Sequence, residues 1–475
     1  MVFSSVIFLL YFLPVFYLSY QIFRTKYKNY LILLASIFFY AWGAPDFIFI
    51  VLGSSVIDYQ IVNLLHKSQD ERKRKILLFL FVSLNLGLLA YFKYANFFVE
   101  NLNSLLATIG FLRVSWTSIA LPIGISFYIF QSITYAVDVY RKESEPVVKL
   151  TDYLVYILSF PQMIAGPIVK YGDIAKQLIS RSETNDDRLI GFYRFVIGLS
   201  KKVLIANVMA EQADLIFNSD YSTLNWVNAW IGALAYTMQI YFDFSGYSDM
   251  AIGLGRMMGF RFPENFDSPY VSRSITEFWR RWHITLGTFM KEYLYIPLGG
   301  NRAGIFRVYF NLILVFLLSG LWHGASWNFI LWGGYHGLFL ILDRIFLLKL
   351  LNKLGLVFSI ASTFFIVVVG WVIFRIEDFN KIGDFFGSMI GKGNASVFKG
   401  DLVLLDFNII FIIAMILSFV TLMNWGKKLE LFFFKKEVYS TKEFVFLGVM
   451  SFVLLLLSIS TLAGSAFNPF IYFRF

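Results

Sequence analysis

The chain has no cysteine among its 475 residues. This absence excludes disulfides, thiolate metal sites, S-palmitoylation and a cysteinyl thioester intermediate. Charged residues are also scarce, at 15% of the chain, and only four histidines are present. An ionisable side chain is costly to place inside a membrane, so each one that interrupts a long apolar stretch of this chain is a candidate functional residue.

Apolar residues dominate the composition. The chain is 58% hydrophobic and 20% aromatic, and its mean hydropathy is +0.66. A soluble domain of this size needs far less apolar surface, and apolar runs long enough to cross a bilayer recur from end to end. We therefore expect an all-α, polytopic integral membrane protein with roughly ten to twelve spanning or re-entrant helices. No repeat, low-complexity segment or soluble-domain linker interrupts residues 1–475, which predicts a single membrane-embedded domain.

The basic residues predict the orientation in the membrane. They give a net charge of +10 and fall in short loops between apolar segments, so orientation explains them better than nucleic-acid binding does. The loops at 24–28, 67–75 and 427–442 are expected to be cytoplasmic, and both chain ends external. Residues 2–22 lack a basic leader and a clear small-residue cleavage site, which favours a retained first span over a removed signal peptide.

Two of the histidines lie in residues 321–336, which read Leu-Trp-His-Gly-Ala-Ser-Trp-Asn-Phe-Ile-Leu-Trp-Gly-Gly-Tyr-His. The ordinary pKa of histidine suits proton transfer near neutrality, so His323, in its Trp-His-Gly context, is a candidate for catalysis. The alternative is a structural histidine bonded to a neighbouring helix. A metal shared with His336 is not expected, because a spacing of 13 residues puts the two side chains on nearly opposite faces of one helix.

Residues 277–302 form a second stretch that contains a histidine. His283 lies among tryptophans and tyrosines, which suit an interfacial or re-entrant helix whose polar groups are buried against protein. Glu277 and Arg281 are spaced i, i+4, so they are expected to pair on that helix.

Polar residues also interrupt residues 238–249, which read Met-Gln-Ile-Tyr-Phe-Asp-Phe-Ser-Gly-Tyr-Ser-Asp. The stretch contains Gln239, Asp243 and Asp249. Carboxylates within a membrane are paired or line a wet cavity. For the two aspartates a structural role, capping or pairing with Arg256, stays as open as a catalytic one.

Several stretches together resemble the membrane-bound O-acyltransferase superfamily. They are Leu121–Gln131, Phe160–Pro167, Gln239–Tyr270, Phe278–His283 and Trp322–Gly324, which match in one consistent order over nearly the whole chain. The resemblance is greatest to the branch that O-acetylates alginate and peptidoglycan, and the D-alanyl transfer proteins of teichoic acids are more distant. It implies a ring of tilted helices around a central tunnel that is open to both sides of the membrane.

The resemblance also implies a reaction. The family moves an acyl group from a thioester made in the cytoplasm to a hydroxyl acceptor across the membrane. His323 matches the catalytic histidine and fits the base that a hydroxyl nucleophile needs. His283 matches its companion, which would orient the donor or stabilise the oxyanion as a hydrogen-bond donor. The residues expected to line or support the tunnel are Asp243, Gln239, Trp322, Asn328, His336 and Arg281, and no metal is expected.

The resemblance extends to donor, partner and location. Acetyl-CoA is the expected donor, with no permanently bound cofactor, and the acceptor is a cell-wall or extracellular polysaccharide. The chain is expected in the inner, cytoplasmic membrane of a bacterium, in contact with lipid and with a secreted partner that resembles SGNH-hydrolase acetyltransferases. The alternatives are D-alanyl transfer to teichoic acid and a transporter without acyl chemistry. A transporter should show an internal repeat, which is not found here.

The chain ends Asn468-Pro-Phe-Ile-Tyr-Phe-Arg-Phe475. Residues 470–475 resemble the C-terminal Phe-x-Tyr-x-x-Phe motif carried by these acyltransferases or by partner microproteins, which implies that Tyr472 is a catalytic relay for the acyl group. A phenol has a pKa of about 10 and a thiol one of about 8.5, so an aryl ester keeps much of the transfer potential of a thioester. The alternative is a tyrosine of the aromatic belt at the membrane interface.

Overall fold

The computed structural model describes residues 1–302, 304–392, 409–422, 426, 428, 439–465 and 467–471, and all regular structure in them is helical. This confirms the all-α prediction. Contacts divide the chain into unit 1, Met1–Asp187 with Gly255–Pro263, and unit 2, Arg188–Leu254 with Glu264–Phe475. The single membrane-embedded domain stays a prediction.

Unit 1 is built from short and medium-length helices. The elements are π-helical η1 (Phe8–Phe12), α1 (Leu13–Ile22), α2 (Thr25–Gly43), 3-10 η2 (Pro45–Phe47), α3 (Ile48–Lys67), α4 (Glu71–Leu89), π-helical η3 (Ala90–Tyr94), α5 (Ala95–Thr108), α6 (Ile125–Tyr140), α7 (Leu150–Leu158), α8 (Phe160–Met163) and α9 (Tyr171–Ile179).

Unit 2 holds the histidine-containing stretches 277–302 and 321–336 and the C-terminal segment. Its helices, with α10 beginning in the last residues of unit 1, are α10 (Asn185–Ser200), π-helical η4 (Lys201–Ala206), α11 (Asn207–Phe217), η5 (Tyr221–Thr223), α12 (Trp226–Met257), η6 (Pro269–Val271), α13 (Ile275–Arg281), α14 (Ile284–Phe289), π-helical η7 (Met290–Tyr295), η8 (Gly300–Arg302), α15 (Ile305–His323), α16 (Trp327–Leu342), π-helical η9 (Asp343–Leu347), α17 (Leu348–Leu354), α18 (Leu356–Arg375), α19 (Phe379–Met389), α20 (Ile409–Leu422) and α22 (Thr441–Gly464).

Five stretches of the described chain are long and apolar enough to cross a membrane. They are Pro45–Lys67, Glu71–Thr108, Ile305–His323, Leu356–Arg375 and Thr441–Gly464, and two shorter apolar helices cover Phe8–Ile22 and Ile409–Val420. The protein is therefore a multi-pass membrane protein. Apolar segments of the sequence near 306–320, 325–348, 357–375 and 444–464 coincide with α15, α16, α18 and α22, and the described part of an apolar segment near 406–424 coincides with α20.

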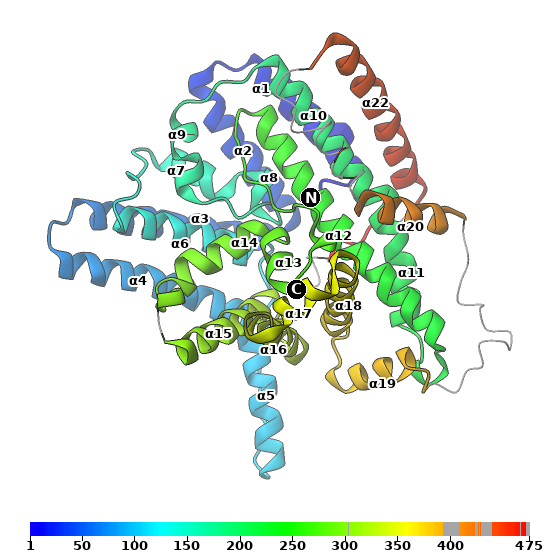
Figure 1. Ribbon diagram of the computed structural model, residues 1–475. Helices are drawn as coiled ribbons and strands as arrows, with labels where there is room; N and C mark the ends of the chain where they lie inside the picture. Colours follow the sequence, from blue (N-terminus) through cyan, green and yellow to red (C-terminus); the bar gives the residue numbers. More distant parts are fainter. Residues whose placement is uncertain are drawn as a thin grey trace. The chain divides into compact units, whose positions relative to one another are not determined.

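Helices α15 and α16 form a closely packed hairpin (Figure 1). Gly320 on α15 faces the backbone of Phe329 on α16, and Gly333 on α16 faces the backbone of Phe316 on α15. A Cβ atom at either glycine would collide with the opposing carbonyl oxygen. Small residues of this kind let membrane helices approach each other closely. The tight hairpin fixes the position of His323, the last residue of α15.

Helix α22 runs beside α10 in the same direction (Figure 1). The Tyr193 hydroxyl on α10 donates to the Phe444 carbonyl at 3.0 Å, and further along Ser200 and Ser458 lie 3.5 Å apart between their hydroxyl oxygens. Helix α22 begins with a capping box, in which Ser440 and Glu443 each accept a hydrogen bond from the other's backbone N–H. The segment after Gly464 therefore lies within unit 2.

Candidate active site

The stretch around His283 is not one continuous helix. We predicted an interfacial or re-entrant helix over 277–302, but α13 ends at Arg281 and α14 begins at Ile284. His283 has φ 45° and ψ 54°, a left-handed conformation that a non-glycine residue rarely adopts. Backbone hydrogen bonds hold the break on both sides, from Ile284 N–H to the Asn265 carbonyl at 2.9 Å and from Asp267 N–H to the Arg281 carbonyl at 3.0 Å. Strained residues of this kind cluster at functional sites.

Asn265 determines which imidazole nitrogen of His283 carries the hydrogen. Its Oδ1 atom lies 3.0 Å from His283 Nδ1 and also accepts from Thr285, at 3.3 Å from the backbone N–H and 2.9 Å from the hydroxyl. Because a backbone N–H can only donate, Oδ1 is an acceptor, and Nδ1 must donate to it. The lone pair of the neutral ring then lies on Nε2.

The second ring nitrogen of His283 is buried and available. Nε2 has no hydrogen-bond partner among the described residues, and the ring packs edge-on against Phe244 at 4.7 Å between centroids. His283 lies outside the candidate spans, and burial lowers its pKa to about 3. The side chain is therefore a neutral imidazole with a nitrogen that can accept a hydrogen bond.

Trp322 brings the two candidate catalytic histidines together. Its ring centroid lies 4.9 Å from that of His323 and 5.9 Å from that of His283. His323 is only 6% exposed and also packs against Trp332 at 5.1 Å and Phe374 at 5.2 Å between ring centroids. Residues 40 positions apart in the sequence thus border one aromatic side chain.

The expected geometry of His323 and His336 is wrong. We placed them on nearly opposite faces of one helix, but α15 ends at His323 and α16 begins at Trp327. Both imidazoles contact Trp332, each at 5.1 Å between ring centroids. His336 is fully buried and also packs edge-on against Trp279 at 5.0 Å. In the described part of the chain, no group of three or more histidine, aspartate or glutamate side chains could hold a metal ion.

Three further predicted site residues have local roles. Arg281 pairs with Glu277 at 2.7 Å, which confirms the predicted i, i+4 pair. Asn328 is buried at the start of α16 and its Nδ2 donates to the Phe374 carbonyl at 3.1 Å. Gln239 is buried on α12, one turn before Asp243, and its Oε1 has no hydrogen-bond partner among the residues that the structure describes.

The aspartates of α12 are ion-paired, but not with Arg256, which pairs with Asp187 instead at 3.3 Å. Asp243 pairs with Lys202 at 2.9 Å and Asp249 with Lys201 at 2.7 Å. The predicted partner is therefore wrong, although the expectation of paired carboxylates holds.

Outside the membrane spans, hydrogen bonds from Arg261 and Thr184 keep the pKa of Asp187 below its usual value despite burial.

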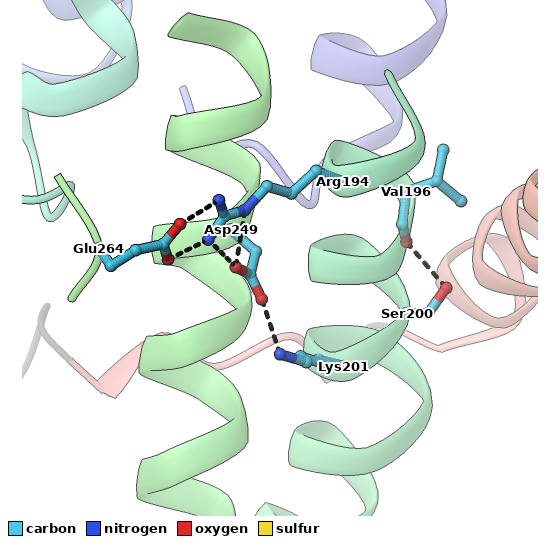
Figure 2. A network of polar contacts seen from close by, with 6 residues as sticks. All are labelled: Arg194, Val196, Ser200, Lys201, Asp249 and Glu264. Atoms are coloured by element: carbon cyan, nitrogen blue, oxygen red, sulfur yellow. Dashed lines mark hydrogen bonds and ion pairs between the residues drawn. The ribbon is translucent and has the colours of Figure 1, made fainter. Parts of the chain in front are cut away.

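Asp249 belongs to a larger network of charges, shown in Figure 2. Arg194 on α10 donates to Asp249 at 2.8 Å and makes two hydrogen bonds to Glu264, at 2.6 and 2.5 Å. Glu264 precedes Asn265 in the chain, and a cavity of about 20 Å³ beside the network is lined by Asn265, Ser245 and Ser248, among others. The network thus supports the loop that orients His283.

Asn265 was not predicted as a site residue. It lies in Phe-Pro-Glu-Asn-Phe, residues 262–266, within a stretch quoted for its family resemblance. A polar residue after Glu264 in a loop was a weak signal, and only the folded chain shows that it faces a histidine 18 residues later.

The last described residues of the chain also lie at α12. The Ile471 N–H donates to Asp243 Oδ2 at 2.8 Å, and Phe470 stacks on Tyr247 with ring centroids 4.7 Å apart. Tyr472 lies outside the described residues. Its role as a relay stays a prediction.

A cavity of about 1310 Å³ also lies in unit 2. It is lined by residues of the loop after α11, the end of α18 and α19, including Tyr221, Arg375 and Asp384. Neither of the two histidines beside Trp322 is among its lining residues.

Comparison with known proteins gives the family. Residues 37–376 match the family described as MBOAT, membrane-bound O-acyltransferase family. This range includes both histidines beside Trp322 and the whole of α12.

Individual relatives extend the similarity over the full chain. The chain is 41% identical to the probable alginate O-acetylase AlgI of Pseudomonas putida over 100% of both chains. It is 37% identical to the peptidoglycan O-acetyltransferase of Helicobacter pylori over 84% of this chain and 81% of that protein. Similarity to the teichoic acid D-alanyltransferase of Bacillus subtilis is lower, 30% over 54% of this chain and 69% of that protein.

Proposed function

Since the chain belongs to the membrane-bound O-acyltransferase family, we propose that it carries an acetyl group from a cytoplasmic thioester across the membrane for O-acetylation of a cell-wall or extracellular polysaccharide. The chain is an O-acyltransferase. The observation that carries the proposal is the pair of histidines at Trp322, one of them held by Asn265 with its Nε2 lone pair available. The names of the alginate and peptidoglycan relatives support acetyl as the group and a polysaccharide as the acceptor.

The chemistry assigns His323 as the general base. A hydroxyl attacks the thioester carbonyl carbon poorly until its proton is removed, and histidine is the usual base. The new C–O bond forms as the C–S bond breaks, and the proton moves from the hydroxyl to His323 and then to the departing thiolate. Each turnover therefore leaves His323 neutral again, and no other reactant is needed.

His283 has a different role in this proposal. In the neutral ring the only N–H is directed at Asn265, so Nε2 can accept a hydrogen bond but cannot donate one. An oxyanion needs donors. The geometry therefore favours a donor-orienting role, in which His283 accepts a hydrogen bond from the acyl donor, over stabilisation of the oxyanion.

The finer features of the proposal follow the family resemblance. Acetyl-CoA is the donor, and it reaches the histidines through a central tunnel within a ring of helices. The acyl group passes to Tyr472 and then to a secreted acetyltransferase of the SGNH-hydrolase type, outside the cytoplasmic membrane of a bacterium.

D-alanyl transfer to teichoic acid is the weaker alternative. The relative with that name matches 54% of the chain at 30% identity, whereas the alginate relative matches all of it at 41%. Identity over the whole chain favours acetyl transfer.

The test is mass analysis of cell-wall and capsule glycans from cells with the gene, without it, and with a His323→Ala copy. We expect ester-linked acetyl groups on one glycan to disappear without the gene and to stay absent with the variant, while D-alanyl esters are unchanged. Loss of D-alanine with acetyl retained would instead support the teichoic acid alternative and overturn the proposal.

Replacing Asn265 by alanine tests the role of His283. The change removes the acceptor for Nδ1–H, so the ring loses both its orientation and its fixed hydrogen position. Leaving a buried donor without a partner costs roughly 1–3 kcal/mol, and we expect kcat/KM for the acyl donor to fall about tenfold or more. Ser245→Ala, which lines the same small cavity but does not bond His283, serves as the matched control. Equal activity of both variants would show that Asn265 does not position the histidine.

A further inference from the structure

The C-terminal segment is held by an ion pair that is almost fully buried. Lys202 of η4 and Asp243 of α12 lie 2.9 Å apart between Nζ and Oδ1, with their side chains 3% and 2% exposed. The simplest role of such a pair would be to join two helices, because a charge buried in a protein needs a partner. The remaining hydrogen-bonding capacity of both side chains, however, is directed largely at residues 469–471.

Lys202 donates two hydrogen bonds in addition to its ion pair with Asp243. One goes to Asn207 Oδ1 at 2.7 Å and the other to the carbonyl oxygen of Pro469. An ammonium has three donors and no acceptor, so the tail carbonyl takes up one of the three. Asn207 adds a contact of its own, from Nδ2 to Asn468 Oδ1 at 3.3 Å.

Asp243 divides its two oxygens in the same way. Oδ1 binds Lys202, and Oδ2 accepts the backbone N–H of Ile471 at 2.8 Å. The two charged side chains therefore bind the main chain on either side of Phe470, whose ring is 4% exposed and stacks on Tyr247. These contacts require a main chain that runs in one direction, so that its carbonyl faces Lys202 and its N–H faces Asp243, and they require one aromatic ring between the two.

We propose that Lys202 and Asp243 form a clasp, a binding site for the chain's own C-terminal segment that positions Tyr472 for the relay; the positional part rests on the function proposed above. The segment in the clasp is residues 468–471. Asp243 and Lys202 are positioning residues, since they act on Tyr472 through the backbone of Ile471, one peptide bond away. They recognise a peptide by its carbonyl, its N–H and an aromatic side chain between them.

The location of the clasp supports a positioning role. Phe244, next to Asp243 on α12, packs against the His283 ring at 4.7 Å between centroids. The backbone N–H of Ile471 thus binds Asp243, and the next residue of α12 contacts His283. A tail released from the clasp would lose this fixed connection to the site.

The absence of cysteine from the chain permits a test that is independent of activity. Ile471→Cys places a single thiol at a position only 3% exposed, and Gly464→Cys places one at an exposed position as the control. In the detergent-solubilised full-length protein, the thiol at position 471 should react slowly with a maleimide probe. Asp243→Ala should raise that rate by about ten- to a hundredfold, the equilibrium equivalent of a lost hydrogen bond to a charged group, and leave the rate at position 464 unchanged.

A charge-swapped chain, Lys202→Asp with Asp243→Lys, distinguishes a clasp for the tail from an ion pair that only joins two helices. The swap keeps one cation and one anion between η4 and α12, but it turns an ammonium toward the Ile471 N–H and a carboxylate toward the Pro469 carbonyl. We expect the thiol introduced by Ile471→Cys to stay reactive in the swapped chain, at a melting temperature near that of the parent. Restored protection of this thiol would show that the pair only joins the helices, and the clasp would be wrong.

Acyl transfer measured on the same proteins, without the engineered thiols, distinguishes the two proposals. If position 471 becomes reactive in Asp243→Ala and transfer is lost, both the clasp and the relay are supported. If position 471 becomes reactive and transfer is intact, the clasp stands as a binding site for the tail, and its role in positioning Tyr472 is overturned. A thiol at position 471 that stays protected in Asp243→Ala overturns the clasp whatever the activity is.

Discussion

His323→Ala is expected to abolish acyl transfer while expression and thermal stability stay near wild type. Removal of a general base typically lowers a rate by about 10²–10⁴-fold. His323 contacts its surroundings chiefly through ring faces and edges of Trp322, Trp332 and Phe374, and much of that aromatic cluster persists without the imidazole. The measurements are O-acetylation of glycans in cells and transfer from labelled acetyl-CoA by purified protein.

The control is His66→Ala. His66 lies on α3, far from His323 in the sequence, and its side chain is 46% exposed. It should leave transfer unchanged. Wild-type O-acetylation by His323→Ala at normal protein levels would refute the proposed mechanism. His283→Ala should impair transfer strongly but less completely, because in our proposal it orients the donor and does not take the proton.

Tyr472→Phe is expected to remove transfer to the external acceptor with almost no effect on folding. The relay needs a hydroxyl at this position, whereas an aromatic-belt tyrosine tolerates the change, since phenylalanine keeps the ring and forfeits at most about one hydrogen bond, roughly 0.5–1.5 kcal/mol. A substitution that removes a single oxygen atom therefore distinguishes the two interpretations. Tyr11→Phe, at a side chain in η1 that is 67% exposed, is the matched control and should be fully active.

Labelled acetyl donor gives a direct measurement of the same step. Incubation with the purified protein should produce a mass shift on Tyr472 in the C-terminal peptide, and the shift should be absent from His323→Ala. A fully active Tyr472→Phe would leave the tail as an anchor, with acetyl passing directly from donor to an acceptor or partner at the histidines.

Hydropathy and motif order were enough to predict the helical class, the positions of the late spans and the histidines that border Trp322. The i, i+4 pair of Glu277 and Arg281 was also predictable, because helical spacing alone brings those side chains together. Such features depend on composition or on residues a few positions apart.

The features that sequence reasoning missed or misassigned depend on distant segments. Asp243 and Asp249 have partners on η4, more than 40 positions earlier, so neighbouring Arg256 was the wrong choice. The break at His283 is held by backbone hydrogen bonds from residues 265–267, and helix propensity does not indicate it. Asn265 became visible as a site residue only once the chain was folded.

The π-helical geometry of η4 has a consequence for how the length of the chain can vary. Hydrogen bonds in a π-helix join residues i and i+5, so each such turn contains one residue more than an α-helical turn. Deleting one residue from 203–206 would restore α-helical spacing, in which neighbouring side chains diverge by about 100°. The wider turn that lets the adjacent Lys201 and Lys202 both reach α12 would be lost, so one of the two lysines would turn away from its aspartate. A stretch that looks like the middle of an ordinary helix is thus one where single-residue deletions should not be tolerated, although substitutions that keep both lysines should be.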